Sequence, residues 1–378
     1  MGPNILVDKS TIQGLNGDEI EILHRYYRVV ISPILIRELT SFLAKVDFGK
    51  EDLQHRLQIL AKKSDSIEAA FTEDEKTVIY NEVIGIPAPM NGFSLPRTGG
   101  KIVEDEDGAK GVFFDEHEDR KILRNWADGI FTTSDFTTAV EIRSFDLDTE
   151  LKRWQKLVEE NKRKIIKFKK IDEVVAWVDK TFLPAADENN MLLEFILKYL
   201  GLDVETNLKM IENWKRNNRT TLYNSAPYSY MFCRIVYVFY FLNLSGVIQT
   251  NKNNKNHIDI CYLYYLPFVS VFTSGDGFFK RISPFFLRDD QVFVDTKDLK
   301  QDLKNIIDFF NKQNEEEKKR FNGEYGIYPP SIEGSITADL WKKHTKPKPP
   351  MAGIQPERSE EELNKFKSKF KSNIDKSK

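Results

Sequence analysis

Cysteine and histidine are scarce in this chain of 378 residues. It has two cysteines, Cys233 and Cys261, and five histidines scattered along the sequence. No CxxC pair is present, and no Cys/His cluster has the spacing of a zinc site. These absences argue against a zinc module and favour a reducing, cytoplasmic setting.

Neither sign of charge dominates. The chain has 56 Lys and Arg against 58 Asp and Glu, a net charge of −2, so a nucleic-acid-binding surface would have to be a local basic patch. One candidate is the run Lys162, Arg163 and Lys164, which could track a nucleic-acid backbone or form a solvated helix face. Residues 342–378 are the other, and there we expect a basic, flexible, solubilising tail rather than an RNA-binding one.

Long uninterrupted apolar runs are also missing. Residues 228–248 come nearest to one, but they include Arg234, Asn243 and Ser245. We therefore predict a buried core helix there rather than a membrane span, and no membrane partner. The apolar run within residues 1–6 is too short for a signal peptide.

Several enzyme motifs are absent. No GxxxxGK[ST] loop exists for a P-loop ATPase, and no GxSxG elbow exists for an α/β-hydrolase. The sequence Asp8-Lys9-Ser10 lacks the second Asp of the haloacid-dehalogenase phosphatases. The chemistry of the chain must therefore come from another pattern.

The two ends of the chain carry an α/β pattern. Short apolar strands over 4–7 and 28–31 are joined by a helix over 18–27, which predicts two parallel strands of a βαβ unit. The last third repeats it, with strands over 268–273 and 291–294 and a helix that Asp295 caps. We predict one discontinuous α/β domain, assigned to residues 1–46 and 222–325.

The middle of the chain, residues 47–221, has a different pattern. A charged amphipathic helix over 51–63 is followed by a stretch rich in Gly and Pro. Residues 101–103 and 112–114 predict a hairpin, and residues 118–218 are strongly helical in pattern. We expect a mostly helical insertion with a small β-rich segment.

Four acids fall at places where an α/β sheet gathers functional groups. Asp8 and Asp276 follow apolar strands, and the carboxyl ends of parallel strands line the crevice of such a sheet. Glu38 and Asp259 lie on helices that could face the same crevice. Clustered carboxylates repel one another unless a cation neutralises them, and Mg²⁺ or Mn²⁺ prefers such oxygen ligands. With no catalytic His or Cys evident, this set favours metal-assisted phosphodiester hydrolysis.

The surroundings of these acids resemble the four ordered motifs of PIN domains. Residues 5–12 form an apolar strand that ends in Asp8, and residues 29–39 form a strand and a Pro that lead to Glu38. Residues 257–267 are similar to the third motif, and residues 271–278 to the fourth. The resemblance covers about a third of the chain. Many family members have Asn where this chain has Ser10, and the gap between the second and third motifs is unusually long.

The resemblance implies a PIN-like three-layer α/β/α fold with a parallel central sheet. It implies that Asp8, Glu38, Asp259 and Asp276 are catalytic and hold Mg²⁺ or Mn²⁺. Ser10, Thr273 and Ser274 would lie near the substrate. The implied function is a metal-dependent endoribonuclease acting on nucleic acid, RNA first. By analogy, a large insertion would suit a regulated toxin or a phage-defence effector with a protein partner or in a homo-oligomer.

Each acid also has an ordinary structural explanation. Asp8 and Asp259 could cap helices, Asp276 could shape a Gly-Asp-Gly turn, and Glu38 could be a solvated helix residue. Asp289, Asp290 and Asp295 are expected to be loop and cap residues, and His257 a surface residue. The alternative hypothesis is therefore a PIN-like fold without catalysis that binds nucleic acid or protein.

Overall fold

The computed structural model describes most of the chain between residues 2 and 345. The described ranges are 2–43, 51–65, 69–95, 100–104, 110–114, 117–144, 168–217, 219, 221–248, 255–320 and 328–345. The basic run Lys162, Arg163 and Lys164 lies outside them, and so do residues 346–378 of the expected tail.

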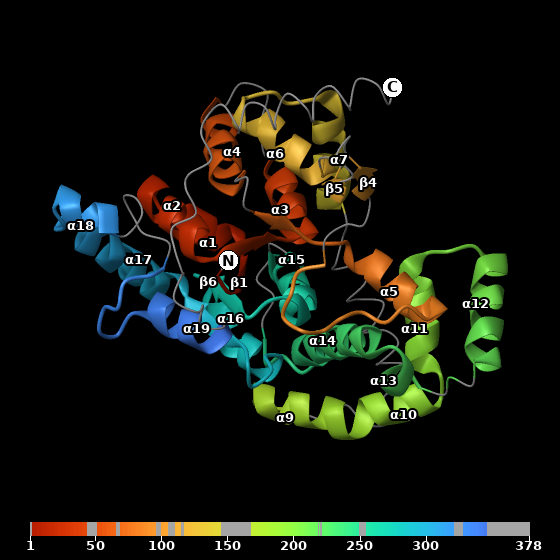
Figure 1. The fold of residues 1–378 in the computed structure, drawn as a ribbon. Helices are drawn as coiled ribbons and strands as arrows, with labels where there is room; N and C mark the ends of the chain where they lie inside the picture. Colours follow the sequence, from red (N-terminus) through yellow and green to blue (C-terminus); the bar gives the residue numbers. More distant parts are fainter. Residues whose placement is uncertain are drawn as a thin grey trace.

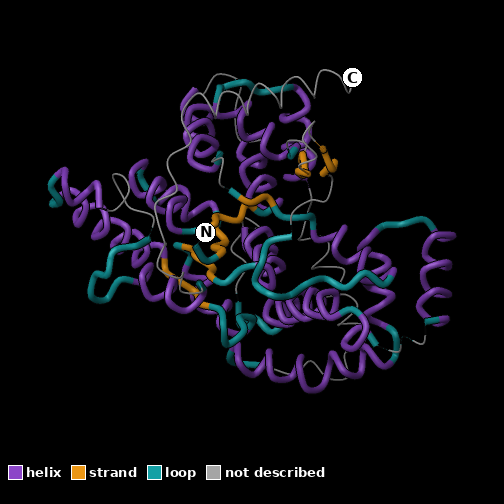
Figure 2. The backbone as a smooth tube through the Cα atoms, viewed as in Figure 1, coloured by secondary structure: helices purple, strands orange, loops and turns teal. Residues whose placement is uncertain are grey.

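A parallel sheet of five strands lies at the centre of the molecule (Figure 2). Its strand order is β3-β2-β1-β6-β7. The strands are β1 (Asn4–Val7), β2 (Arg28–Ile31), β3 (Ala70–Phe71), β6 (Val271–Ser274) and β7 (Val292–Asp295). Strands from the two ends of the chain are therefore neighbours, and the mixed α/β class expected from the sequence is confirmed.

The central strand β1 is covered on both faces. Its consecutive residues Ile5, Leu6 and Val7 have no exposed surface, although successive strand side chains point to opposite faces. Phe272, beside Leu6 on β6, packs edge-on against Phe279 of α16 (Gly277–Ile282). Burial on both faces explains why these strands are continuous apolar runs rather than alternating ones.

The first helices begin at clear local signals. The helix α1 (Lys9–Gly14) directly follows β1, and α2 (Gly17–Tyr26) begins with a capping box formed by Asn16 and Glu19. Pro33 is the first residue of α3 (Pro33–Leu43), a position where its missing N–H costs nothing.

The segment after α3 covers that helix and extends the sheet. The helix α4 (Glu51–Ser64) contacts α3 and α6, and α3 contacts α7, as the upper part of Figure 1 shows. The strands β4 and β5 pair antiparallel as the predicted hairpin, apart from the central sheet. The bounds here are α5 (Glu75–Ile84), β4 (Gly100–Glu104), β5 (Lys110–Phe114), α6 (Glu118–Ala127) and α7 (Thr133–Ser144).

A second group of helices packs around α14 (Pro227–Leu244), the predicted core helix. Phe232, Cys233 and Val238 of α14 are buried, and none of the described helices is long and apolar enough to cross a membrane. The other members are α9 (Ile171–Trp177), the π-helical turn η1 (Val178–Phe182), α10 (Leu183–Glu188), α11 (Met191–Leu200), α12 (Val204–Arg216) and α13 (Leu222–Ser225).

The last third of the chain returns to the sheet. The helix α17 (Thr296–Asn311) is capped by Asp295, as predicted, and contacts α1, α2 and the strands β6 and β7. The remaining elements are α15 (Lys255–Cys261), the 3-10 helix η2 (Tyr262–Phe268), η3 (Ser283–Phe285), α18 (Glu315–Arg320) and α19 (Ile336–His344).

Three details differ from the sequence expectations. The edge strand β3 comes from the segment assigned to the insertion, because Ala70 and Phe71 pair with Val30 and Ile31. The sixth strand begins at Val271, since residues 262–268 form a 3-10 helix. The helix α19 lies beyond the expected domain end at residue 325, and the indole of its Trp341 donates to Tyr26 O at 2.6 Å.

Candidate active site

The strand order creates a topological switch point between β1 and β6. From β1 the chain continues to β2 and β3 on one side, and it returns to β6 and β7 on the other. The connections on the two sides of β1 therefore run in opposite directions, and open α/β sheets bind ligands at the carboxyl ends of the strands at such a point. Asp8 follows β1, and Asp276 follows β6 by two residues.

Asp8 is a buried helix cap with an additional contact across the sheet. Its carboxylate is 4% exposed and accepts hydrogen bonds from Thr11 N at 2.8 Å, from Ser10 Oγ at 2.8 and 2.9 Å, and from Ser274 Oγ at 2.6 Å. Burial raises the pKa of Asp8, against the lowering effect of these hydrogen bonds. The capping explanation is correct, but it does not account for the bond to Ser274 on the neighbouring strand.

Ser10 and Ser274 continue this network to the fourth motif. The Ser10 hydroxyl accepts from Gly275 N at 2.8 Å, and the Ser274 hydroxyl accepts from Asp276 N at 3.0 Å. A Cβ atom at Gly275 would lie 3.3 Å from Ser10 Oγ, so a larger residue would crowd the network. Asp276 itself is exposed and caps α16 through Phe278 N at 2.7 Å.

Glu38 lies inside the structure rather than on a solvated face. Its side chain is 14% exposed and forms an ion pair with Lys9 Nζ through Oε1. Tyr262 OH donates to its Oε2 at 2.8 Å. The interpretation of Glu38 as a solvated helix residue is therefore wrong.

Asp259 lies within α15 and is affected by the other three acids. Burial, and then the negative charges of Glu38, Asp276 and Asp8, raise the pKa of Asp259 to about 8, and only the charge of Lys9 opposes them among its main influences. Like charges act in this way when carboxylates share one region. The four acids, from distant parts of the chain, thus contribute to one negative electrostatic field.

Thr273 and Ser274 have different surroundings although both were predicted near the substrate. Ser274 contacts Asp8, whereas Thr273 points to the other face of the sheet because strand side chains alternate. Its hydroxyl is buried and has no hydrogen-bond partner among the described residues. The backbone carbonyl of Thr273 accepts from Thr11 Oγ1 at 3.1 Å, so its contact with α1 is made by the main chain.

The weaker candidates have ordinary roles where the structure describes them. Asp290 pairs with Arg288 at 2.9 Å, and Asp295 caps α17 and contacts Lys280. The side chain of His257 lies outside the described part. Lys9 and Tyr262 were missed, although Lys9 directly follows Asp8 and Tyr262 follows Asp259 by three residues, one helical turn away.

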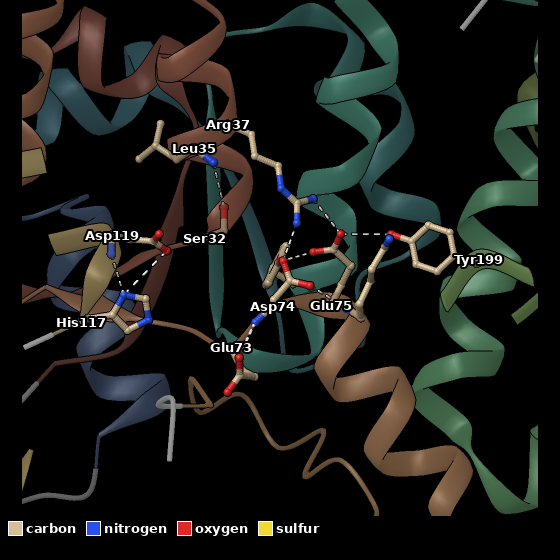
Figure 3. A network of polar contacts seen from close by, with 11 residues as sticks. Ser32, Leu35, Arg37, Glu73, Asp74, Glu75, His117, Asp119 and Tyr199 are labelled. Atoms are coloured by element: carbon tan, nitrogen blue, oxygen red, sulfur yellow. Dashed lines mark hydrogen bonds and ion pairs between the residues drawn. The ribbon is translucent and has the colours of Figure 1, made fainter. Parts of the chain in front are cut away.

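A polar network around the buried Glu75 holds the helix that carries Glu38. Arg37 of α3 donates to Glu75 at 2.8 Å and pairs with Asp74, the cap of α5 (Figure 3). Glu75 is 1% exposed and also accepts from Tyr199 OH at 3.0 Å and Tyr265 OH at 2.7 Å. Burial raises the pKa of Glu75, but the charge and hydrogen bonds of Arg37 outweigh it and the net pKa is lowered. Glu75 is therefore held ionised between α3, α5, α11 and η2.

The far end of α1 is held by two lysines from other helices. Lys63 Nζ of α4 donates to Leu15 O at 2.5 Å, and Lys300 Nζ of α17 donates to Gly14 O at 2.6 Å. Positive charge at a helix C-terminus satisfies free carbonyls and complements the helix dipole. These contacts fix the helix whose first turn carries Lys9 and Ser10.

The donor atoms of the site suit a hard divalent cation in kind. Carboxylate and hydroxyl oxygens are the ligands that Mg²⁺ and Mn²⁺ prefer, and the negative charges of Glu38, Asp276 and Asp8 add to burial in raising the pKa of Asp259. Within the described part of the chain, however, no three acidic, His or Cys side chains have the spacing of a metal site. Lys9 forms an ion pair with an oxygen of Glu38. The carboxylate oxygens of Asp8 accept hydrogen bonds from hydroxyls and a backbone N–H.

Comparison with known proteins adds no family to this picture. No protein-family model, curated protein or solved structure matches the chain.

Proposed function

We propose that this chain is a metal-dependent phosphodiester hydrolase with a PIN-like fold, and that its substrate is RNA. The observation that supports this most strongly is the position and charge of the acids. Asp8 and Asp276 follow the two strands that border the switch point. Burial raises the pKa of Asp259 most, and the charges of Glu38, Asp276 and Asp8 add to it, to a value of about 8. A strongly shifted pKa at such a switch point is typical of a functional site.

The residues of the site would have different roles in this function. Asp8, Glu38, Asp259 and Asp276 would hold the cation, after side-chain movement brings their oxygens together. A cation bound there supplies positive charge for the phosphate and lowers the pKa of water. Ser10 and Ser274 orient the Asp8 carboxylate through their hydroxyls. The Gly275 region, exposed beside Ser10, is where a phosphate would approach.

The helical segment between the two halves would select the substrate or control access. Glu75 of its α5 accepts from Arg37 on α3, the helix that carries Glu38, and Tyr199 of α11 donates to Glu75. Control of a nuclease by a large additional segment suits a regulated toxin or a phage-defence effector, and that part of the proposal rests on analogy.

A second function is favoured by two specific observations. Glu38 is neutralised by Lys9, and the described acids have no ready spacing for a metal. A PIN-like module that binds nucleic acid or protein without cutting would need no metal at this site. The two functions differ in whether a divalent cation changes what the protein does to nucleic acid.

A cleavage assay distinguishes them. Purified protein is incubated with mixed tRNA, rRNA and single-stranded DNA in Mn²⁺, Mg²⁺ or EDTA. The double variant Asp8→Asn, Asp276→Asn is compared with wild type and with the control Asp135→Asn, Asp203→Asn. The control also changes two aspartates at helix N-termini, and it changes them away from the site.

The proposal predicts that wild type and the control both cleave RNA, and that this cleavage depends on the metal. Asp8→Asn, Asp276→Asn should lower the rate by more than about a hundredfold, because even indirect partners of metal ligands cost about 10- to 100-fold. Equal binding of nucleic acid by all three proteins, with no cleavage at any metal, would support the binding module instead.

A further inference from the structure

The ammonium group of Lys9 lies among the acids of the candidate site. It forms an ion pair with Glu38 Oε1, and the two side chains are only 19% and 14% exposed. Tyr262 OH donates to the other carboxylate oxygen of Glu38 at 2.8 Å. Both oxygens of Glu38 are therefore engaged by donors from the protein itself.

Lys9 is also next to a second acid of the site. It directly follows Asp8, which is itself buried. Like charges that are gathered in one place repel, and any cation placed among them relieves the repulsion. Lys9 and a divalent cation would thus each relieve the repulsion among these carboxylates, and each would bind Glu38.

We propose that Lys9 is an internal counter-cation that holds Glu38 while the site is free of metal and releases it when a divalent cation binds. This inference rests on the proposed function, because it takes Glu38 as a metal ligand. Two cations that compete for one carboxylate are reciprocally coupled. Lys9 therefore stabilises the metal-free protein and weakens its affinity for the metal. Its role is to position Glu38.

The structure offers the released ammonium group a second contact. The ring of Phe42 lies 5.8 Å from Lys9 Nζ, within the range of a cation–π interaction. Phe42 follows Glu38 by four residues on α3, so the two side chains are neighbours on one helix face. Lys9 can move away from Glu38 along this face and keep a favourable contact.

Titration of the full chain with Mn²⁺, without nucleic acid, tests the inference. Free Mn²⁺ is measured by electron paramagnetic resonance for wild type, Asp8→Asn, Lys9→Met, Lys9→Arg and the control Lys209→Met. Lys209 forms an exposed ion pair with Glu205 on α12. We expect Lys9→Met to bind Mn²⁺ about tenfold more tightly than wild type, a coupling of ordinary size. Lys9→Arg keeps the charge and should gain nothing, and Lys209→Met should match wild type.

Thermal unfolding gives a second readout. In EDTA, Lys9→Met should unfold at a lower temperature than wild type because the acids lose their counter-charge. Added Mn²⁺ should raise its midpoint by more than that of wild type, since a tighter ligand stabilises the folded state more. If Lys9→Met does not fold, Lys9→Gln serves for the same comparison.

The outcomes separate the inference from the proposed function. If wild type binds Mn²⁺, Asp8→Asn does not, and Lys9→Met binds no more tightly than wild type, the role of Lys9 is overturned and the metal site stands. If neither wild type nor Lys9→Met binds Mn²⁺, the inference and the metal-dependent function fail together.

Discussion

At the scale of single residues, two neighbours on β6 differ in what their hydroxyls contact. Ser274 Oγ donates to Asp8 at 2.6 Å and accepts from Asp276 N. The Thr273 hydroxyl is buried without a hydrogen-bond partner among the described residues. Adjacent positions on one strand thus allow a hydroxyl that forms hydrogen bonds to be compared with one that forms none among the described residues.

Ser274→Ala should lower the free energy of unfolding by about 1–3 kcal/mol, the usual cost of leaving a buried polar group without a partner. Thr273→Val should leave it unchanged or raise it slightly, because a buried hydroxyl without a partner is costly. Urea unfolding at pH 7 in EDTA measures both variants. Equal losses would mean that the Ser274 hydroxyl contributes no more than the Thr273 hydroxyl.

At the scale of elements, α14 depends on an acid from a distant helix. Glu82 of α5 accepts from Tyr228 N at 3.1 Å, Ser229 N at 2.7 Å and Ser229 Oγ at 2.9 Å. These bonds satisfy free N–H groups at the first turn of α14, where a negative charge is also favourable. Burial nonetheless raises the pKa of Glu82, against the hydrogen bonds that lower it.

Glu82→Gln should destabilise the protein by about 1–3 kcal/mol, because its amide NH₂ would face a backbone N–H donor. The loss should depend on pH. The pKa of Glu82 is higher in the folded protein than in the unfolded chain, so the folded protein holds this proton more tightly. The stability that protonation of Glu82 contributes is fully present below the unfolded pKa and is lost as pH rises through the folded pKa. The stability gap between wild type and Glu82→Gln should therefore narrow as pH increases.

Thermal unfolding of both proteins from pH 4 to pH 7.5 measures this gap. Glu188→Gln, at the exposed end of α10, provides the control and should show no such trend. A gap that widens with pH would show that the charged form of Glu82 is the better cap.

At the scale of the whole molecule, the Arg37–Glu75 network joins parts of the chain that lie far apart in sequence. It connects α3, which carries Glu38, to α5, α11 and η2. The described hydrophobic core is likewise one cluster that extends from the sheet to α14 and its surrounding helices. The segment that interrupts the α/β pattern is therefore packed into the same body as the candidate site.

Arg37→Met should lower the free energy of unfolding by about 1–3 kcal/mol, because Glu75 keeps its two tyrosine donors but loses its counter-charge. The loss should be smaller than for a fully buried pair, since the Arg37 side chain is 39% exposed. Arg124→Met removes the more exposed pair with Asp65 and should cost less than about 1 kcal/mol. Similar losses in urea unfolding would mean that the network adds nothing beyond a surface ion pair.

Much of the fold was predictable because its signals are local. Apolar runs over 4–7 and 28–31, Pro33 as the first residue of α3 and Asp295 before α17 each mark an element within a few residues. The strand β3 escaped prediction because two residues, Ala70 and Phe71, carry no periodicity. Pairing with β2 alone makes them a strand.

The sequence by itself determined the α/β class, the order of the four acidic motifs and the types of their donor atoms, since these depend on local pattern and composition. The tertiary structure decided which strands are neighbours, and so placed Ser274 against Asp8. It also decided that Lys9 and Tyr262 engage Glu38. Contacts between residues that are distant in the sequence follow from sheet order and burial, which no local pattern contains.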